Sequence, residues 1–236
     1  MKKCFLGVLL ALCFAIPAIA EEITLPKDIT VGKYIAHVGA GGTVSIDSNG
    51  YRLLETMPVT FYTIIDRQWG LVYGGAASMS AVMEKDADGR TVVTFTGKKP
   101  GAINFTEKIT FGTGEVEIIY DYEILKKIPN MNCDMTIKLP EIAYAGADYK
   151  AVERGGAKTG KLPADKPKST VLRYDDWNYL RNLQIESKAG PVNFALSNHN
   201  WSLSDSRSDN RLKSYCLWAI CPTSVGNKTL KINLKL

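Results

Sequence analysis

The alternation of apolar and polar positions is most regular between residues 78 and 139. From Val116 to Ile124 every second residue is apolar, and most of the residues between them are acidic. This period of two is typical of a strand with one buried face. Segments 105–111 and 131–139 alternate in the same way. We therefore predict four or five sequential antiparallel strands in one sheet.

Short turn sequences separate these segments. Asp86–Gly89 and Gly112–Gly114 lie between predicted strands, and glycine in such turns adopts a positive φ easily. Upstream, Asn49-Gly50 joins two further alternating segments, and Asn-Gly is a strong hairpin signal. The predicted connections are therefore hairpins.

Further strands are predicted at 29–38, 59–65, 171–174, 183–186, 192–196, 215–220 and 229–236. The last of these alternates leucine and isoleucine with lysine, and we expect it at a sheet edge, where lysine discourages further pairing. The only helix expected is a short turn around residues 175–182. The fold class is therefore all-β, a large antiparallel β-sandwich or supersandwich of about a dozen strands with little helix.

Residues 144–170 break this pattern, because Gly, Ala, Lys and Pro dominate them. We expect a long loop there, since a stretch without periodicity inside a domain is usually a lid, a binding loop or an insertion. Between Lys150 and Lys168 it holds six basic and two acidic residues. It is interpreted either as a solvated surface loop or as a basic flap over a site for an anionic ligand.

Residues 1–20 have the features of a secretory signal peptide. Lys2 and Lys3 precede an apolar run, and Ala18-Ile19-Ala20 fits the small-residue cleavage rule. The run is too short to span a bilayer comfortably, and no transmembrane segment is expected elsewhere. We predict an exported protein, periplasmic or extracellular, with a single all-β domain over residues 21–236.

Charge and cysteine content limit the expected partners. Without Lys2 and Lys3 the net charge falls from +5 to +3, which does not indicate a nucleic-acid partner. Cys133, Cys216 and Cys221 remain after the signal peptide. Cys216 and Cys221 are expected on opposite faces of one strand, roughly 16 Å apart, so they cannot pair. We expect hydrophobic packing instead of a disulfide framework, and a monomer.

Motifs for metalloprotease, nucleotide-hydrolase and α/β-hydrolase chemistry are missing from the sequence. Asp86 and Asp88 resemble part of a calcium loop, but a hairpin turn explains them better. Asp205, Asp209 and Asn210 form a second, weak group of oxygen ligands. We therefore expect neither a metal nor a cofactor.

Three of the four tryptophans lie between residues 175 and 218, among polar side chains. A sugar presents an apolar face rimmed by hydroxyls, so its site needs a flat aromatic ring with polar groups at the edge. The candidate ligand-binding residues are Trp177, Trp201, Asp176, Asn200, Asp205 and Arg207. The alternative is that the tryptophans belong to the core, and for Trp218, inside an apolar strand, this interpretation is favoured.

Catalytic candidates are less well defined. His199 lies in the polar aromatic segment, and Asp205 follows it closely. Glycoside cleavage needs two acids facing each other across the bond. No spacing singles out such a pair among Asp175, Asp176, Asp205, Glu117 and Glu123.

The segments Val192–Leu196, Trp201–Arg207 and Tyr215–Ile220, following the long meander, resemble the galactose-mutarotase-like supersandwich domains of secreted bacterial carbohydrate-active proteins. The resemblance implies a concave sheet face that meets carbohydrate. Mutarotases of this kind use a histidine acid and a glutamate base. This sequence does not match those motifs, since His199 lacks the family context and has no evident glutamate partner.

The leading hypothesis is an exported bacterial protein that recognises a glycan through an aromatic and polar platform. One alternative is a glycan-active enzyme, either a glycoside hydrolase or a polysaccharide lyase. A lyase is favoured if the 150–168 loop neutralises an anionic polysaccharide. The other alternative is a structural or adhesion protein of the cell envelope.

Overall fold

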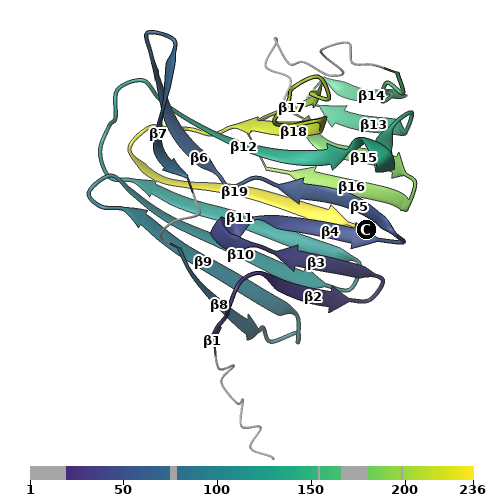
Figure 1. Ribbon diagram of the computed structural model, residues 1–236, viewed down its shortest axis with the longest axis horizontal. Helices are drawn as coiled ribbons and strands as arrows, with labels where there is room; N and C mark the ends of the chain where they lie inside the picture. The colour runs from purple at the N-terminus through teal and green to yellow at the C-terminus, as the bar shows by residue number, and fades with distance from the viewer. Residues whose placement is uncertain (1–19, 75–78, 154, 166–179, 198) are drawn as a thin grey trace, which may run out of the picture.

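The computed structural model describes residues 20–74, 79–153, 155–165, 180–197 and 199–236. Two large antiparallel sheets face each other, which confirms the predicted all-β sandwich (Figure 1). The described helices are two short turns, η1 (Ala40–Gly42) and α1 (Glu141–Tyr144). None of the described helices is long and apolar enough to cross a membrane.

The first sheet, sheet A, has ten strands in the order β1-β8-β9-β10-β11-β19-β16-β15-β13-β14. Their bounds are β1 Glu21–Glu22, β8 Ser80–Lys85, β9 Thr91–Lys99, β10 Ile103–Gly112, β11 Glu115–Ile124, β13 Asp148–Glu153, β14 Gly156–Lys161, β15 Leu180–Ser187, β16 Gly190–Leu196 and β19 Gly226–Lys235.

The second sheet, sheet B, runs β17-β18-β12-β5-β4-β3-β2, and a hairpin of β6 and β7 joins it through β12. Their bounds are β2 Lys27–Val31, β3 Tyr34–Val38, β4 Val44–Ser48, β5 Tyr51–Thr56, β6 Thr60–Ile65, β7 Gln68–Gly74, β12 Met131–Pro140, β17 Asn200–Asp205 and β18 Ser214–Ile220. The β6–β7 hairpin extends beyond the rim of the sandwich (Figure 1).

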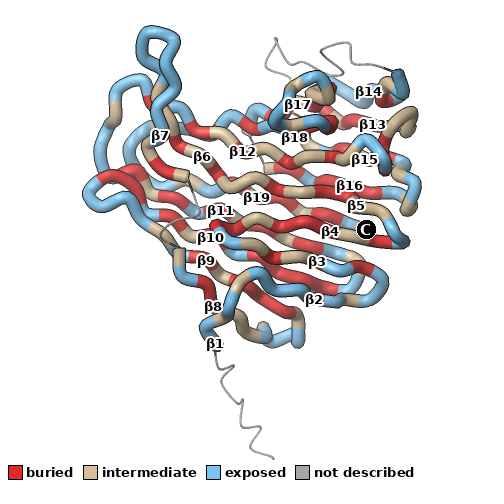
Figure 2. Tube along the Cα trace, in the orientation of Figure 1, coloured by how far each residue is buried: buried red, intermediate tan, exposed pale blue. Residues whose placement is uncertain are grey.

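Side chains that alternate along the strands fill the space between the sheets. In β11 the apolar residues from Val116 to Ile124 are buried and face the core, as the period of two predicts. Figure 2 shows the same alternation of buried and more exposed positions along both sheets. Sequential pairing is confirmed for β8 to β11. The next segment, β12, is a strand as predicted, but it belongs to sheet B.

The C-terminal strand does not lie at an edge. β19 pairs with β11 on one side and with β16 on the other, so the edge prediction is wrong. Lys231 and Lys235 are compatible with this central position because they alternate with buried residues and point away from the core. Lys231 forms an ion pair with Glu117 of β11, with 2.5 Å between Nζ and Oε1.

Residues 148–161 form a hairpin instead of a loop. β13 pairs with both β14 and β15, and β14 is the edge strand of sheet A. All but one of the β14 residues are exposed, so no apolar period marks it in the sequence. The strand expected at 171–174 lies outside the described residues. So does the helical turn expected at 175–182, except for residues 180–182, which begin β15.

One charged side chain is enclosed in the core. Glu107 of β10 lies directly opposite Tyr120 of β11, and both are fully buried. Burial raises the pKa of the Glu107 carboxyl well above its usual value. The carboxyl packs against η1, where a Cβ on Gly42 would lie 1.7 Å from Glu107 Oε2. Gly42 therefore leaves the room that Glu107 occupies.

Candidate functional site

A cavity of about 730 Å³ lies on the outer face of sheet B, where the β6–β7 hairpin meets strands β12, β17 and β18. Side chains that alternate with the core residues of these strands form its floor. Thr136 of β12 is the register partner of Trp218 of β18, which in turn is paired with Ser202 of β17. Cross-strand partners point to the same side of a sheet, so all three face the cavity.

Aromatic rings form one side of this cavity. Tyr62 of β6 and Trp69 of β7 have ring centroids 5.7 Å apart, with an angle of 32° between the rings. Asp66 and Arg67, both at positive φ, make the tight turn that brings the two strands of the hairpin together. Trp69 is 58% exposed and Trp218 is 37% exposed, so both rings can contact a ligand.

Asp134 of β12 lies between these aromatic residues. Its carboxylate lies near the Tyr62 hydroxyl and the Trp218 indole N–H. Burial raises the pKa of Asp134, and these two neighbouring donor groups partly offset that rise. Asp134 therefore lies beside two of the rings that line the cavity.

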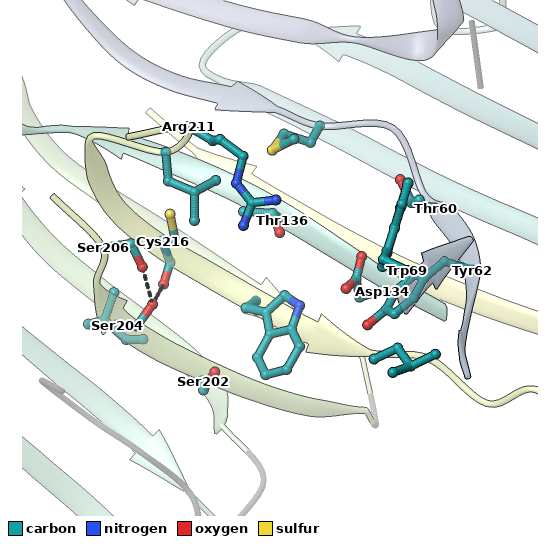
Figure 3. A pocket seen from close by; sticks show the side chains of 15 residues that line it. Thr60, Tyr62, Trp69, Asp134, Thr136, Ser202, Ser204, Ser206, Arg211 and Cys216 are labelled. Carbon is teal, nitrogen blue, oxygen red and sulfur yellow. Dashed lines mark hydrogen bonds between the residues drawn. The ribbon is translucent and has the colours of Figure 1, made fainter. Parts of the chain in front are cut away.

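The opposite side of the cavity carries a cation and several hydroxyl groups. Arg211 lies on the side of the cavity opposite Asp134 and Trp69, and its side chain extends over the cavity (Figure 3). Asp209 stabilises the turn that carries Arg211, because its Oδ1 accepts a hydrogen bond from the backbone N–H of Arg211 at 2.7 Å. Ser204 Oγ and Ser206 Oγ are hydrogen-bonded to each other at 3.0 Å on the same side.

These groups suit the recognition of a polyhydroxylated ligand. Exposed rings offer apolar faces, while Thr, Ser, Asp and Arg supply donors and acceptors beside them. Among the described residues that line the cavity, Asp134 is the only carboxylic acid, and no histidine occurs. The cavity thus holds one carboxyl group, together with the Tyr62 hydroxyl and the Cys216 thiol.

The predicted platform residue Trp201 is buried in the core. Its side chain is completely inaccessible, so the prediction that it stacks on a sugar is wrong. Trp201 pairs with Ala219, and both belong to the inward face of sheet B. Trp218 needs the opposite correction. Its apolar neighbours in the sequence predicted a core residue, but its side chain lines the cavity.

Asp205 and Arg207 hold the structure together at the edge of sheet B. Their side chains are 0% and 5% exposed, and Arg207 Nη2 lies 2.9 Å from Asp205 Oδ2. Arg207 also contacts Glu141 Oε1 at 2.5 Å and lies over the Tyr215 ring, 4.7 Å from its centroid. With these partners, neither residue is available to a ligand as predicted, and Asp205 is not placed for catalysis.

The remaining candidates do not meet at one site. His199 Nδ1 contacts Ser197 Oγ at 3.0 Å, and burial lowers the pKa of its ring. Neither His199 nor the exposed Asn200 lines the cavity. Trp177 and Asp176 lie outside the described residues.

Sequence reasoning missed Trp69, Tyr62 and Asp134 and assigned Trp218 to the core. β18 is apolar on both faces, so its period did not separate inward from outward positions. Trp69 lies just beyond the predicted strand at 59–65, and it belongs to β7, the returning strand of a hairpin. The one available signal was the alternation of β12, which already placed Asp134 opposite the apolar face.

The described residues contain no group of three or more His, Cys, Asp or Glu side chains that could hold a metal ion.

Neither a family model nor a curated protein sequence matches the chain. Solved structures do match it. A galactose mutarotase-like protein from Clostridium acetobutylicum is 11% identical with a TM-score of 0.55, covering 92% of this chain and 97% of that one. A second, from Lactobacillus casei, is 9% identical with a TM-score of 0.53, covering 89% and 99%.

An α-N-acetylgalactosaminidase from Bifidobacterium bifidum, solved with GalNAc, is 10% identical with a TM-score of 0.54. The match covers 89% of this chain and 35% of the enzyme. At these identities the likeness concerns the fold, and it confirms the galactose-mutarotase-like supersandwich predicted from the sequence.

Proposed function

We propose that this chain is an exported protein that binds a glycan in the cavity on the outer face of sheet B. The observation that carries the proposal is the meeting of Trp69, Tyr62 and Trp218 around the Asp134 carboxylate. The rings would stack on the apolar faces of sugar units, and Asp134 would accept hydrogen bonds from their hydroxyls. The fold, which is shared with carbohydrate-related proteins, supports the same class of ligand.

Arg211 adds a preference for acidic glycans to this proposal. Its guanidinium faces the cavity, and a bound carboxylate or sulfate would meet it through charge-assisted hydrogen bonds. The basic hairpin β13–β14 does not support that preference, because none of its residues lines the cavity.

A second candidate function is glycan turnover with Asp134 as a proton donor. A carboxyl whose pKa is raised by burial is suited to general-acid catalysis near neutral pH. The glycosidase mechanism needs a second carboxyl group, and the described lining residues provide Asp134 alone. Binding is therefore the function that the cavity supports better.

The test is affinity electrophoresis of the purified protein through gels with neutral, uronic or sulfated polysaccharides. We expect one class to retard the wild type, and Trp69→Ala and Trp218→Ala to abolish the retardation. Ile220→Ala is the matched control, because Ile220 is 50% exposed on the same strand as Trp218 and does not line the cavity. Equal retardation of all three variants, or retardation of none of the proteins, would contradict the proposal.

Asp134→Asn then separates binding from turnover. The amide keeps the shape of the side chain but cannot donate or accept the proton of an acid–base step. If the retarding glycan is also cleaved, the variant should bind it and leave it intact. If the glycan is bound but not cleaved by the wild type, the second candidate function is refuted for that glycan.

A further inference from the structure

Two of the three cysteines that follow the expected signal peptide face each other across neighbouring strands. Asp134 of β12 is the register partner of Ile220 of β18, which places Cys133 opposite Cys221. The backbone N–H of Cys221 donates to the carbonyl of Cys133 at 2.8 Å. Opposed residues joined in this way have Cα atoms about 5.5 Å apart, within the range that a disulfide bridges.

Their side chains also share one environment. Cys133 and Cys221 are 1% and 3% exposed, and both belong to the core between the sheets. Each of them lies near the Tyr122 ring, and burial together with the neighbouring Cys221 thiol raises the pKa of Cys133. The structure holds both as free thiols.

Cys216 is the natural comparison. Cys216 lies in β18, the strand that ends just before Cys221, but it lines the cavity on the outer face of sheet B. Its thiol contacts Ser214 instead of another cysteine. Cys216 therefore cannot reach Cys133 without turning over its strand.

We propose that Cys133 and Cys221 are a disulfide-forming pair, oxidised by thiol–disulfide exchange with an external disulfide while Cys216 stays reduced. One cysteine thiolate attacks the external disulfide and releases a thiol, forming a mixed disulfide. The second cysteine then displaces the remaining thiol. The net change joins the two sulfur atoms, removes two hydrogen atoms from the protein and reduces the external disulfide to two thiols.

The position of the pair favours bridging without loss of the sheet. Cys221 lies just beyond the last residue of β18, and Pro222 follows it, so the backbone on that side is not fixed by further ladder pairing. Because both thiols are buried, exchange needs the pair to be exposed. We expect it to be fast during refolding and slow in the folded protein.

The test is to refold the full chain in a buffer of reduced and oxidised glutathione, block free thiols and digest with trypsin. The expected product joins peptide 128–138 to peptide 214–228, with a mass two hydrogen atoms below the sum of peptide 128–138 and of peptide 214–228 blocked at Cys216. Chymotryptic cleavage after Leu217 or Trp218 then assigns the bridge to Cys221. Cys216→Ser should keep the linked peptide, and Cys221→Ser should lose it.

Thermal unfolding provides an independent readout. The bridge would close a long loop, since the two cysteines are 88 positions apart. Loss of such a constraint should lower the melting temperature of the oxidised wild type by about 5–10 °C when reductant is added. Cys221→Ser should not respond to the reductant. A folded wild type without the linked peptide, or a bridge that contains Cys216, would overturn the proposal.

Discussion

Trp201 and Trp218 lie side by side on neighbouring strands but face opposite sides of sheet B. Trp201 is the register partner of Ala219, one residue from Trp218, and successive residues of a strand point to opposite faces. Trp201 is thus enclosed in the core, while Trp218 is open to the cavity.

The two tryptophans should therefore respond differently to truncation. Trp201→Ala should lower the free energy of unfolding by about 3–5 kcal/mol, because it removes a fully buried ring. Trp218→Ala should lower it by no more than about 1 kcal/mol. Urea unfolding followed by fluorescence or circular dichroism measures both values. A large loss in Trp218→Ala would place that ring in the core after all.

Arg207→Ala should destabilise the protein by about 3–5 kcal/mol, because it leaves the inaccessible Asp205 carboxylate without its guanidinium partner. Arg211→Ala is the control for loss of an arginine, since the Arg211 side chain is 89% exposed, and it should change the free energy of unfolding by less than about 0.5 kcal/mol. Chemical unfolding of the two variants compares them. Similar small losses would show that the Arg207 pair has no stabilising role.

Glu107→Gln should change how stability depends on pH. The pKa of Glu107 is raised in the folded state, so its contribution is fully present below the unfolded pKa and is lost as pH rises through the folded pKa. Each unit of the rise corresponds to about 1.4 kcal/mol. The glutamine variant should therefore gain stability relative to the wild type in the pH window above the ordinary glutamate pKa of 4.5.

Urea titrations at several pH values across that window would show the gain. Glu186→Gln is the control, because Glu186 is exposed on β15, and it should follow the wild-type profile. Parallel profiles for Glu107→Gln and the wild type would mean that Glu107 titrates normally in the folded protein.

Gly42→Ala should cost more than a comparable change at Gly50. Both glycines have a positive φ, +77° and +78°, so both variants carry the backbone penalty of about 1 kcal/mol. The Cβ at position 42 would also meet the Glu107 carboxyl, whereas nothing lies within 4 Å of the Cβ position at Gly50. We expect a further loss of about 1–3 kcal/mol in Gly42→Ala.

Replacing Glu107 with alanine in the Gly42→Ala background tests the cause of that further loss. If the carboxyl is the obstacle, the two substitutions together should cost less than the sum of their separate effects. Additive losses in thermal or chemical unfolding would refute the steric explanation.

The strands that the sequence predicts well are those with one face in the core and one in solvent. β10, β11 and β12 are of this kind, and their alternation survives in the structure. The hairpin β13–β14 was missed because its edge strand is exposed along nearly its whole length. The central place of β19 was missed because its lysines indicate exposure on one face, which an edge strand and a central strand can share.

The residues that line the cavity differ from those predicted for the candidate site. Aromatic rings beside Asp, Asn and Arg were expected, and the cavity has exposed rings beside Asp134 and Arg211. Which tryptophan faces outward depends on the register between β17 and β18, and on the hairpin that brings Trp69 towards Tyr62. Those are contacts between segments, and composition within one segment does not determine them.

The position of β19 also has a consequence for how the chain is made. Residues 226–235 follow all the other described strands along the chain, yet they join the β8–β11 half of sheet A to the β13–β16 half. Until they emerge, sheet A consists of two separate halves, each with an unpaired edge where β19 will insert. The nascent chain therefore cannot complete its sandwich before residues 226–235 are synthesised, and the two halves of sheet A stay open to other contacts until then.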